Sequence, residues 1–277
     1  MTIIVPTDFS ENARFAANYA CEIAQAKGQQ LHLLHCYTSS SVGDNDADDA
    51  ENPLLLADQK IQELQTQLIQ EFPQLHISIE CSRSLIIDKL TELSQTGKYG
   101  MIVMGASGES QSKPLYWGST TVAVASKSKL PVTVIPNHSF HFDIQQAALL
   151  TNFKPEELDT LKEFQNIMGA PQKLTLIHVF KESQKAENVA EDLDSWAYNI
   201  REMGTIEQVN TIAEPIHKDD IELDSVPEVL SKVITEADPQ IILITPSRKT
   251  FFERLFSSSV SKAIALELSK PAFFDKI

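Results

Sequence analysis

Short apolar runs alternate with helical patterns along this chain of 277 residues. Residues 2–5 form an apolar run, small apolar residues recur at helical spacing between Ser10 and Gly28, and residues 31–37 are apolar again. Strand, helix and strand in this order make a β-α-β unit, which requires parallel strands and a right-handed crossover. The pattern therefore predicts an α/β fold with a mostly parallel sheet.

The alternation continues far enough to complete a doubly wound domain of five strands. Residues 54–72 are expected to form an amphipathic helix with Ile61, Leu68 and Ile69 on its inner face. Two further helices are expected, one over residues 85–95 and one after Gly118. The strands are expected at residues 2–5, 31–37, 76–81, 101–104 and 132–135.

The second half of the chain repeats this order. Thr151-Asn152-Phe153 follows an apolar run as Thr7-Asp8-Phe9 follows the first one, and His178 matches His35. We therefore predict two tandem domains of the same fold, residues 1–140 and 141–277. The strands of the second domain are expected at residues 147–150, 173–180, 207–212, 241–245 and 271–274.

Glycine is concentrated in one stretch of the first half. The chain has only nine glycines, and five of them lie from Gly97 to Gly118. Gly105, Gly108, Gly118 and Ser119 form the pattern G-x2-G-x9-G-S between a predicted strand and a predicted helix. Strand, glycine loop and helix N-terminus are the parts of a phosphate-binding cradle, in which a side chain at the glycines would block the anion. The spacing differs from that of a Walker A loop and of a Rossmann fingerprint.

A carboxylate stands at the end of the first predicted strand. Asp8 lies where open α/β sheets bind their ligands, at the carboxyl ends of the strands. It suits the hydroxyl groups of a ribose or the N–H donors of an adenine. The alternative is structural, because either Asp8 or Ser10 could cap the following helix.

The glycine pattern and the segment Pro6-Thr7-Asp8-Phe9-Ser10 together resemble the universal stress protein family, in its tandem two-domain form. This resemblance implies the adenine nucleotide alpha hydrolase-like fold, bound ATP and a role in the cellular stress response. It implies that phosphates rest on N–H groups of residues 105–108 and 118–121, with the hydroxyls of Ser119 and Thr121 added. It also implies that Asp8 holds the ribose or the adenine. Cys36 would contact the adenine edge through its backbone, and a magnesium ion could bridge the phosphates. The residues expected to bind the nucleotide are Pro6, Thr7, Asp8, Cys36, Met104, Gly105, Gly108, Gly118, Ser119, Thr120 and Thr121.

The second half lacks this pattern. At an offset of 140 residues the signature glycines and serine correspond to Thr245, Arg248, Ser258 and Ser259, and Asn152 stands in place of Asp8. A side chain at these positions would fill the space that a phosphate chain needs. We therefore expect one nucleotide per chain, held by the first domain.

The net charge and the cysteine content indicate which binding partners and which cellular compartment are expected. The formal net charge of −15 disfavours binding to nucleic acid or to an anionic membrane. The N-terminus has no basic region before its apolar run, and no apolar run reaches transmembrane length. The three cysteines have no metal-binding or redox spacing, which fits a reducing cytoplasm. They are Cys21, Cys36 and Cys81.

Three further expectations concern metal binding, catalysis and assembly. His32 and His35 are three residues apart on a predicted strand and should face opposite sides, so we predict no shared metal. No catalytic base or arginine finger is evident, which leaves weak ATP hydrolysis, or an interaction module with an empty site, as alternatives. In the family resembled, the last strands of two domains commonly pair across a dimer axis. A tandem chain could pair residues 132–135 with 272–274 as an intramolecular pseudo-dimer, and a homodimer is the other possible assembly.

Overall fold

A computed structural model describes residues 1–38, 53–107, 118–217, 225–246 and 269–276 of the chain. The chain divides into two compact units. The first is Met1–Phe142 with the two C-terminal residues, and the second is Asp143–Asp275. Each unit contains a five-stranded parallel sheet with helices packed against it, so the predicted α/β class and doubly wound fold are confirmed.

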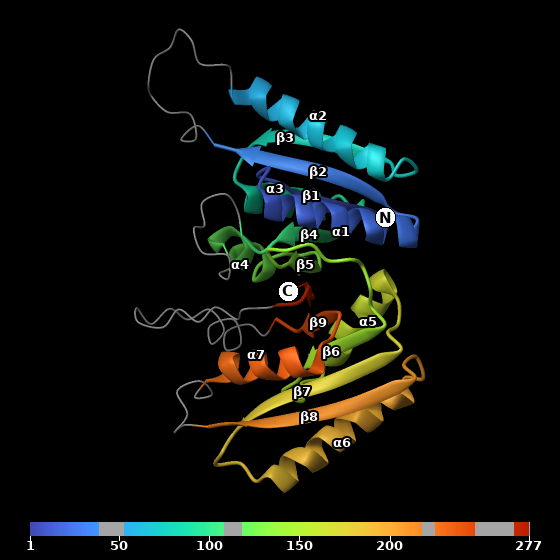
Figure 1. Cartoon of the computed structure of the whole chain (residues 1–277), viewed down its shortest axis with the longest axis vertical. Helices are drawn as coiled ribbons and strands as arrows, with labels where there is room; N and C mark the ends of the chain where they lie inside the picture. Colours follow the sequence, from blue (N-terminus) through green and yellow to red (C-terminus); the bar gives the residue numbers. More distant parts are fainter. Residues whose placement is uncertain (39–52, 108–117, 218–224, 247–268, 277) are drawn as a thin grey trace. The chain divides into compact units, whose positions relative to one another are not determined.

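The strands of the first unit lie in the order β3-β2-β1-β4-β5, and Figure 1 labels them in that sequence. All neighbouring strands pair in parallel. The strands are β1 (Thr2–Pro6), β2 (Gln30–Tyr37), β3 (Ile77–Arg83), β4 (Tyr99–Gly105) and β5 (Val132–Ile135). The helices are α1 (Glu11–Lys27), α2 (Pro53–Glu71), α3 (Ile86–Ser94) and α4 (Ser119–Ala125).

This strand order places a topological switch point between β1 and β4. The chain runs outward from β1 to β2 and β3, then returns to β4 and continues to β5 on the other side. With right-handed crossovers, α1 and α2 cover one face of the sheet and α3 and α4 cover the other. The connections on the two sides of β1 and β4 therefore leave in opposite directions, which opens a crevice at the carboxyl ends of these two strands.

Helix α1 has the ends that the sequence indicates. The Ser10 side chain caps it by accepting a hydrogen bond from the backbone N–H of Ala13. The helix ends at Gly28, whose φ of 63° is left-handed and therefore suits a residue without a side chain. Asp8 does not cap the helix directly. It accepts hydrogen bonds from the backbone N–H and the hydroxyl of Ser10, so it supports the residue that does.

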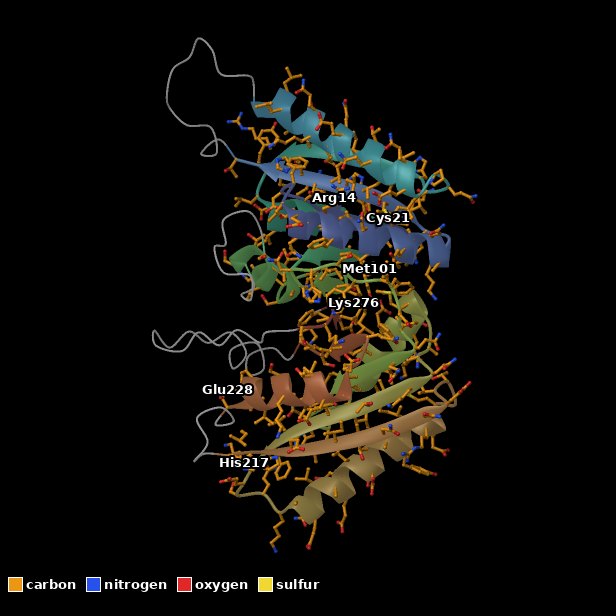
Figure 2. All side chains as sticks on the ribbon, in the orientation of Figure 1. Arg14, Cys21, Met101, His217, Glu228 and Lys276 are labelled. Carbon is orange, nitrogen blue, oxygen red and sulfur yellow. The ribbon has the colours of Figure 1, made fainter. Side chains whose placement is uncertain are left out.

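The core of the first unit lies on both faces of its central strands. Ile3, Ile4 and Val5 of β1 are fully buried, as expected for a parallel sheet with helices on both faces. Cys21 of α1 and Met101 of β4, both labelled in Figure 2, are also fully buried. Burial raises the pKa of the Cys21 thiol to about 12, so it is an inert core residue.

One predicted core position of α2 is wrong. Ile61 and Leu68 are buried as expected, but Ile69 is 38% exposed. Ile69 lies about 100° around the helix from Leu68, which turns it away from the apolar stripe.

Across the described residues, no helix is both long enough and apolar enough to cross a membrane.

The second unit has the same connectivity, with strand order β10-β9-β6-β7-β8, of which Figure 1 labels β9 to β8. Strand β8 extends beyond the predicted residue 212 because it pairs with β7 as far as Lys181 and Ile216. It includes Pro215, which an edge strand tolerates. The strands are β6 (Gln146–Leu150), β7 (Lys173–Lys181), β8 (Gln208–Ile216), β9 (Ile241–Ile244) and β10 (Ala272–Phe274). The helices in the described residues are α5 (Glu156–Met168), α6 (Ala186–Glu202) and α7 (Val226–Ala237).

A corner built around a phenylalanine and a histidine follows the first strand of each unit. In the first unit, Phe9 has a left-handed φ of 66°, and its N–H donates to the Thr7 hydroxyl oxygen at 3.0 Å. The His35 ring bonds to the Thr7 carbonyl at 2.8 Å and lies 4.5 Å from the Phe9 ring. A left-handed residue with a side chain costs about 1–2 kcal/mol, which these contacts offset.

The second unit reproduces this corner. Phe153 has φ 59°, and its N–H bonds to the Thr151 hydroxyl at 3.0 Å. His178 bonds to the Thr151 carbonyl at 2.8 Å, and its ring lies 4.6 Å from that of Phe153. The match predicted between His35 and His178 therefore corresponds to the same local structure in both units.

Helices α1 and α5 correspond residue by residue at an offset of 144, because their buried positions then coincide. Ala13 corresponds to Glu157, whose side chain is only 2% exposed. The Glu157 carboxylate accepts hydrogen bonds from the Thr151 hydroxyl and from the Asn152 N–H. Burial raises the pKa of Glu157 above its ordinary value, and these donors only partly oppose that shift.

The raised pKa of Glu157 makes a prediction about stability. A carboxyl group whose pKa is raised in the folded state stabilises the fold below its unfolded pKa, and this contribution is lost as pH rises through the folded pKa. We expect the Glu157→Gln variant to melt above the wild type at pH 8 and to lose that advantage at pH 4. Scanning calorimetry at the two values measures this, with Glu156→Gln, an exposed neighbour, as the control. A difference that is the same at both values would contradict the prediction.

Candidate functional site

A cavity of about 290 Å³ lies at the carboxyl ends of β1 and β4, in the first unit. It therefore occupies the switch point at which doubly wound sheets bind ligands. Ten of the eleven residues that the sequence singled out line it, and Gly108 lies outside the described residues. The lining consists of Pro6, Thr7, Asp8, Ala13, Cys36, Ile86, Met104, Gly105, Ser107, Gly118, Ser119, Thr120 and Thr121.

The first wall of the cavity is the segment that ends β1. Pro6 is the last residue of the strand, and the N–H of Thr7 continues its ladder by donating to the Leu34 carbonyl at 2.9 Å. The Thr7 hydroxyl is committed to the N–H of Phe9. Asp8 is exposed, and its hydrogen bonds with Ser10 fix the carboxylate beside the cavity.

The apolar wall is formed by side chains from three elements. Cys36 comes from β2, Ile86 from the start of α3 and Met104 from β4. The Ser84 hydroxyl donates a long hydrogen bond of 3.7 Å to the Cys36 sulfur. Burial raises the pKa of the Cys36 thiol, so the group is neutral at physiological pH and contributes an uncharged surface rather than a nucleophile.

The backbone that leaves β4 is already hydrogen-bonded within the unit. The N–H of Ala106 donates to the Ile135 carbonyl at 2.8 Å, and that of Ser107 donates to the Asn12 side chain at 2.8 Å. The N–H of Gly118 donates to the Ala106 carbonyl at 2.7 Å. These three N–H groups, which the resemblance assigns to the phosphates, therefore already have acceptors within the unit, and their role toward a ligand stays a prediction.

The two described signature glycines differ in what surrounds them. A Cβ added at Gly105 would lie 2.6 Å from Oδ1 and 2.8 Å from Cγ of Asn12. A Cβ added at Gly118 would meet nothing closer than 3.7 Å, and the φ of −66° suits any residue. Gly105 therefore makes room for a protein side chain, and only Gly118 leaves open space beside the cavity.

The start of α4 supplies the polar wall. Ser119 and Thr120 are exposed. The Thr121 hydroxyl, which the resemblance assigns to the phosphates, is buried and instead donates to the Gly105 carbonyl at 2.9 Å. By helix geometry the N–H groups of the first turn have no acceptor inside the helix. The hydroxyls of Ser119 and Thr120 and these N–H groups are the polar donors that the wall offers.

Three residues that line the cavity were not predicted from the sequence, and each has its own reason. Ala13 reads as an ordinary core alanine of α1, and Ile86 reads as an apolar residue of α3. Ser107 lies inside the glycine pattern, at a position where any residue is allowed. Proximity to the motif could have identified Ser107, whereas Ala13 and Ile86 required the fold.

In the second unit, larger side chains stand at the described positions that correspond to this region. Thr245 corresponds to Gly105, and its hydroxyl donates to the hydroxyl oxygen of Thr160 at 2.8 Å. Thr160 is fully buried and corresponds to Ala16 of α1. The other predicted substitutions, Arg248, Ser258 and Ser259, lie outside the described residues.

The two candidate histidines of β2 have separate partners. His32 bonds to Ser78 at 2.9 Å and to Glu80 at 3.1 Å, whereas His35 bonds to the Thr7 carbonyl. Burial lowers the pKa of His32 below its ordinary value, so its ring is neutral at neutral pH. Among the residues with described positions, no group of three or more His, Cys, Asp or Glu could hold a metal ion.

Comparison with known proteins identifies the family of the first unit. Residues 1–136 match the model of the universal stress protein family. Among curated proteins, none matches the sequence.

Solved structures resemble the chain over its whole length or over half of it. A universal stress protein from Archaeoglobus fulgidus is 18% identical, with a TM-score of 0.69 over 99% of this chain and 96% of that chain. A putative universal stress protein from Pseudomonas aeruginosa is 13% identical, with a TM-score of 0.59 over 99% and 92%. A universal stress protein in complex with cAMP is 22% identical and covers 50% of this chain and 98% of that one, with a TM-score of 0.38. The first two likenesses cover both units and show a shared fold. Residues 1–136, nearly the whole first unit, therefore belong to the universal stress protein family.

Proposed function

We propose that the first unit binds ATP and that the chain acts as a universal stress protein in the cytoplasmic stress response. The observation that supports this most directly is the cavity at the switch point between β1 and β4. It joins an apolar wall, a carboxylate and a row of hydroxyls, and ten of its thirteen lining residues are ones that the sequence singled out. These are the three kinds of surface that a base, a ribose and a phosphate chain require.

The described lining fits a nucleotide in size and chemistry. Its volume of about 290 Å³ is close to the lower end of ligand pockets, which are typically about 300–1,000 Å³. Cys36, Ile86 and Met104 suit the faces and edge of a base, and Asp8 suits hydroxyl or N–H donors. Ser119 and Thr120 would hold the phosphates with the N–H groups of their helix turn. Asp8 is the only acidic residue of the described lining, and no Lys or Arg lines it, so Mg²⁺ would serve to offset the charge of the phosphates.

The test is to identify what the purified protein carries and what it binds. We expect heat denaturation of the purified chain to release ATP, detected by mass spectrometry, and calorimetric titration of the stripped protein to give saturable ATP binding. The double variant Ser119→Ala/Thr120→Ala removes two hydrogen bonds to a charged group, each contributing about 1.5–3 kcal/mol. Its affinity should fall at least tenfold. Thr235→Ala, an exposed threonine of α7, is the control and should bind as the wild type does. Absence of saturable ATP binding by the stripped wild type would refute the proposal.

The alternatives predict different results in the same preparation. Phosphate release well above background would indicate an ATP-hydrolysing enzyme, although no base other than Asp8 lines the described cavity. Neither released nucleotide nor ATP binding would indicate an interaction module with an empty site. In our proposal the second unit is a structural or regulatory partner of the first, and the pseudo-dimer or a homodimer stays a prediction.

A further inference from the structure

Asn12, the second residue of α1, joins three parts of the first unit through one buried side chain. It is 3% exposed. Its Oδ1 accepts from the N–H of Ser107 at 2.8 Å, just after β4. Its Nδ2 donates to the carbonyls of Ile135 at 3.2 Å and Pro136 at 2.9 Å, at the end of β5. Both polar atoms of the amide are therefore committed to backbone groups of two neighbouring strand ends.

The backbone that Asn12 holds is the one on which the cavity wall rests. Ser107 and Gly105 both line the cavity. The Thr121 hydroxyl donates to the Gly105 carbonyl at 2.9 Å, and the Gly118 N–H donates to the Ala106 carbonyl at 2.7 Å. The start of α4 is thus attached to residues 105–107, whose position the Asn12 amide sets from the opposite side.

Gly105 is required by this amide. A Cβ at Gly105 would lie 2.6 Å from Oδ1 and 2.8 Å from Cγ of Asn12, and 3.1 Å from its carbonyl carbon. Contacts below 3.0 Å cannot persist, and the carbonyl carbon of a helix cannot give way as a side chain does. Any residue other than glycine would therefore displace the Asn12 side chain.

The second unit provides an internal comparison. At the offset of 144 that aligns α1 with α5, Asn12 corresponds to Glu156, which is exposed. At the offset of 140 that aligns β4 with β9, Gly105 corresponds to Thr245, whose hydroxyl bonds to Thr160. The asparagine and the glycine are therefore both replaced in the unit that lacks the glycine motif.

We propose that Asn12 is a positioning residue for nucleotide binding. It fixes the distance between the end of β4 and the start of α4 at the value that the ligand needs. The proposal rests on the function proposed for the first unit. Asn12 does not line the cavity and acts through Ser107, Gly105 and the residues attached to them.

The test is a double-mutant cycle on the full chain, read by ATP titration at a temperature where every variant is folded. We expect Asn12→Ala to raise the Kd at least tenfold, and Gly105→Ala to do the same because its methyl group displaces the amide. In the Asn12→Ala background, adding Gly105→Ala should change the Kd by less than twofold, because the two contacts below 3.0 Å, with Oδ1 and Cγ, are gone and only the 3.1 Å contact with the backbone carbonyl carbon remains. Coupled sites are expected to show such non-additivity.

A control separates positioning from a general loss of stability. Ile23→Val removes a methylene group from a fully buried side chain of α1 at about 16 Å along the helix from Asn12, and typically costs about 0.5–1.5 kcal/mol. It should lower Tm and leave the Kd unchanged. If Asn12→Ala does not fold, the Kd of Gly105→Ala is the test. Slow hydrogen exchange of the Ser107 N–H is then also expected in the wild type.

The outcomes distinguish the two proposals. A wild type that binds ATP, with an Asn12→Ala or Gly105→Ala variant of equal affinity, would overturn the positioning role and leave the proposed function intact. Additive effects of the two substitutions would overturn the coupling between them. A wild type that does not bind ATP would refute the proposed function itself, and the positioning role with it.

Discussion

Titration of the full chain with ATP is expected to saturate at one nucleotide per chain. The cavity of the first unit is lined by Ala13 and Gly105, two positions with little or no side chain. Their counterparts in the second unit are Glu157, which is buried, and Thr245, which bonds to Thr160, and both have larger side chains. The expected stoichiometry follows from this difference in side-chain volume and from a difference in charge.

The difference in charge concerns Glu157 and Asn152. Glu157 is a buried carboxyl group. Its oxygens accept hydrogen bonds from the Thr151 hydroxyl and the Asn152 N–H. An ionised carboxylate at this depth would repel a phosphate chain in a medium of low effective dielectric constant, where two charges interact far more strongly than in water. Asn152 also lacks the charge that Asp8 offers to hydroxyl or N–H donors.

Isothermal titration calorimetry of the stripped protein measures the stoichiometry, and equilibrium dialysis with labelled ATP checks it. The matched variants are Ala13→Glu and Glu157→Ala. We expect Ala13→Glu to abolish binding, because it places in the first unit the group that fills the second. Glu157→Ala should leave the stoichiometry at one, since Thr245 remains. Two ATP molecules per wild-type chain would contradict this account.

The second large effect is expected at Gly118. The variant Gly118→Leu should lose at least tenfold in ATP affinity and keep its fold. The position has φ −66° and ψ 147°, which any residue adopts, and a Cβ there meets only ordinary contacts of 3.7 Å or more. Beyond that carbon, a leucine side chain would extend over the cavity that Gly118 lines.

A matched substitution elsewhere tests whether the effect is specific. Lys185 precedes α6 as Gly118 precedes α4, with a similar extended backbone and no capping bond from its side chain. Lys185→Leu should change neither the affinity nor, by more than a few degrees, the melting temperature. Circular dichroism and calorimetry compare the variants. Unchanged ATP affinity in Gly118→Leu would show that the nucleotide does not occupy this cavity.

Hydrophobic periodicity and turn residues predicted the fold well because both act locally. The strand β5 was placed at residues 132–135, the end of α1 was placed at Gly28, and its cap was narrowed to Asp8 or Ser10, of which Ser10 is the cap. Errors arose where a neighbour decided the outcome. Strand β8 continues to Ile216 because β7 offers a pairing partner, and Ile69 is exposed because α2 presents only one stripe to the sheet.

The candidate site was predictable in position and less so in chemistry. A motif between β4 and α4 and a segment after β1 must meet at the switch point, and the cavity lies there. The sequence could not show that the N–H groups of residues 106, 107 and 118 are already bonded, because their acceptors are distant in the chain. For the same reason the sequence indicated Gly105 as a phosphate contact. In the structure, a side chain at this position would instead collide with the Asn12 side chain.

The corner formed by Thr7, Phe9 and His35 has a consequence for how such a chain can diverge. The second unit retains it bond for bond while lacking the acid and the glycine that accompany it in the first. The bonds that shape this strand end are therefore independent of the groups that would face a ligand. A copy of the domain can lose its ligand residues by ordinary sequence drift and remain a folded neighbour, free to acquire a different role.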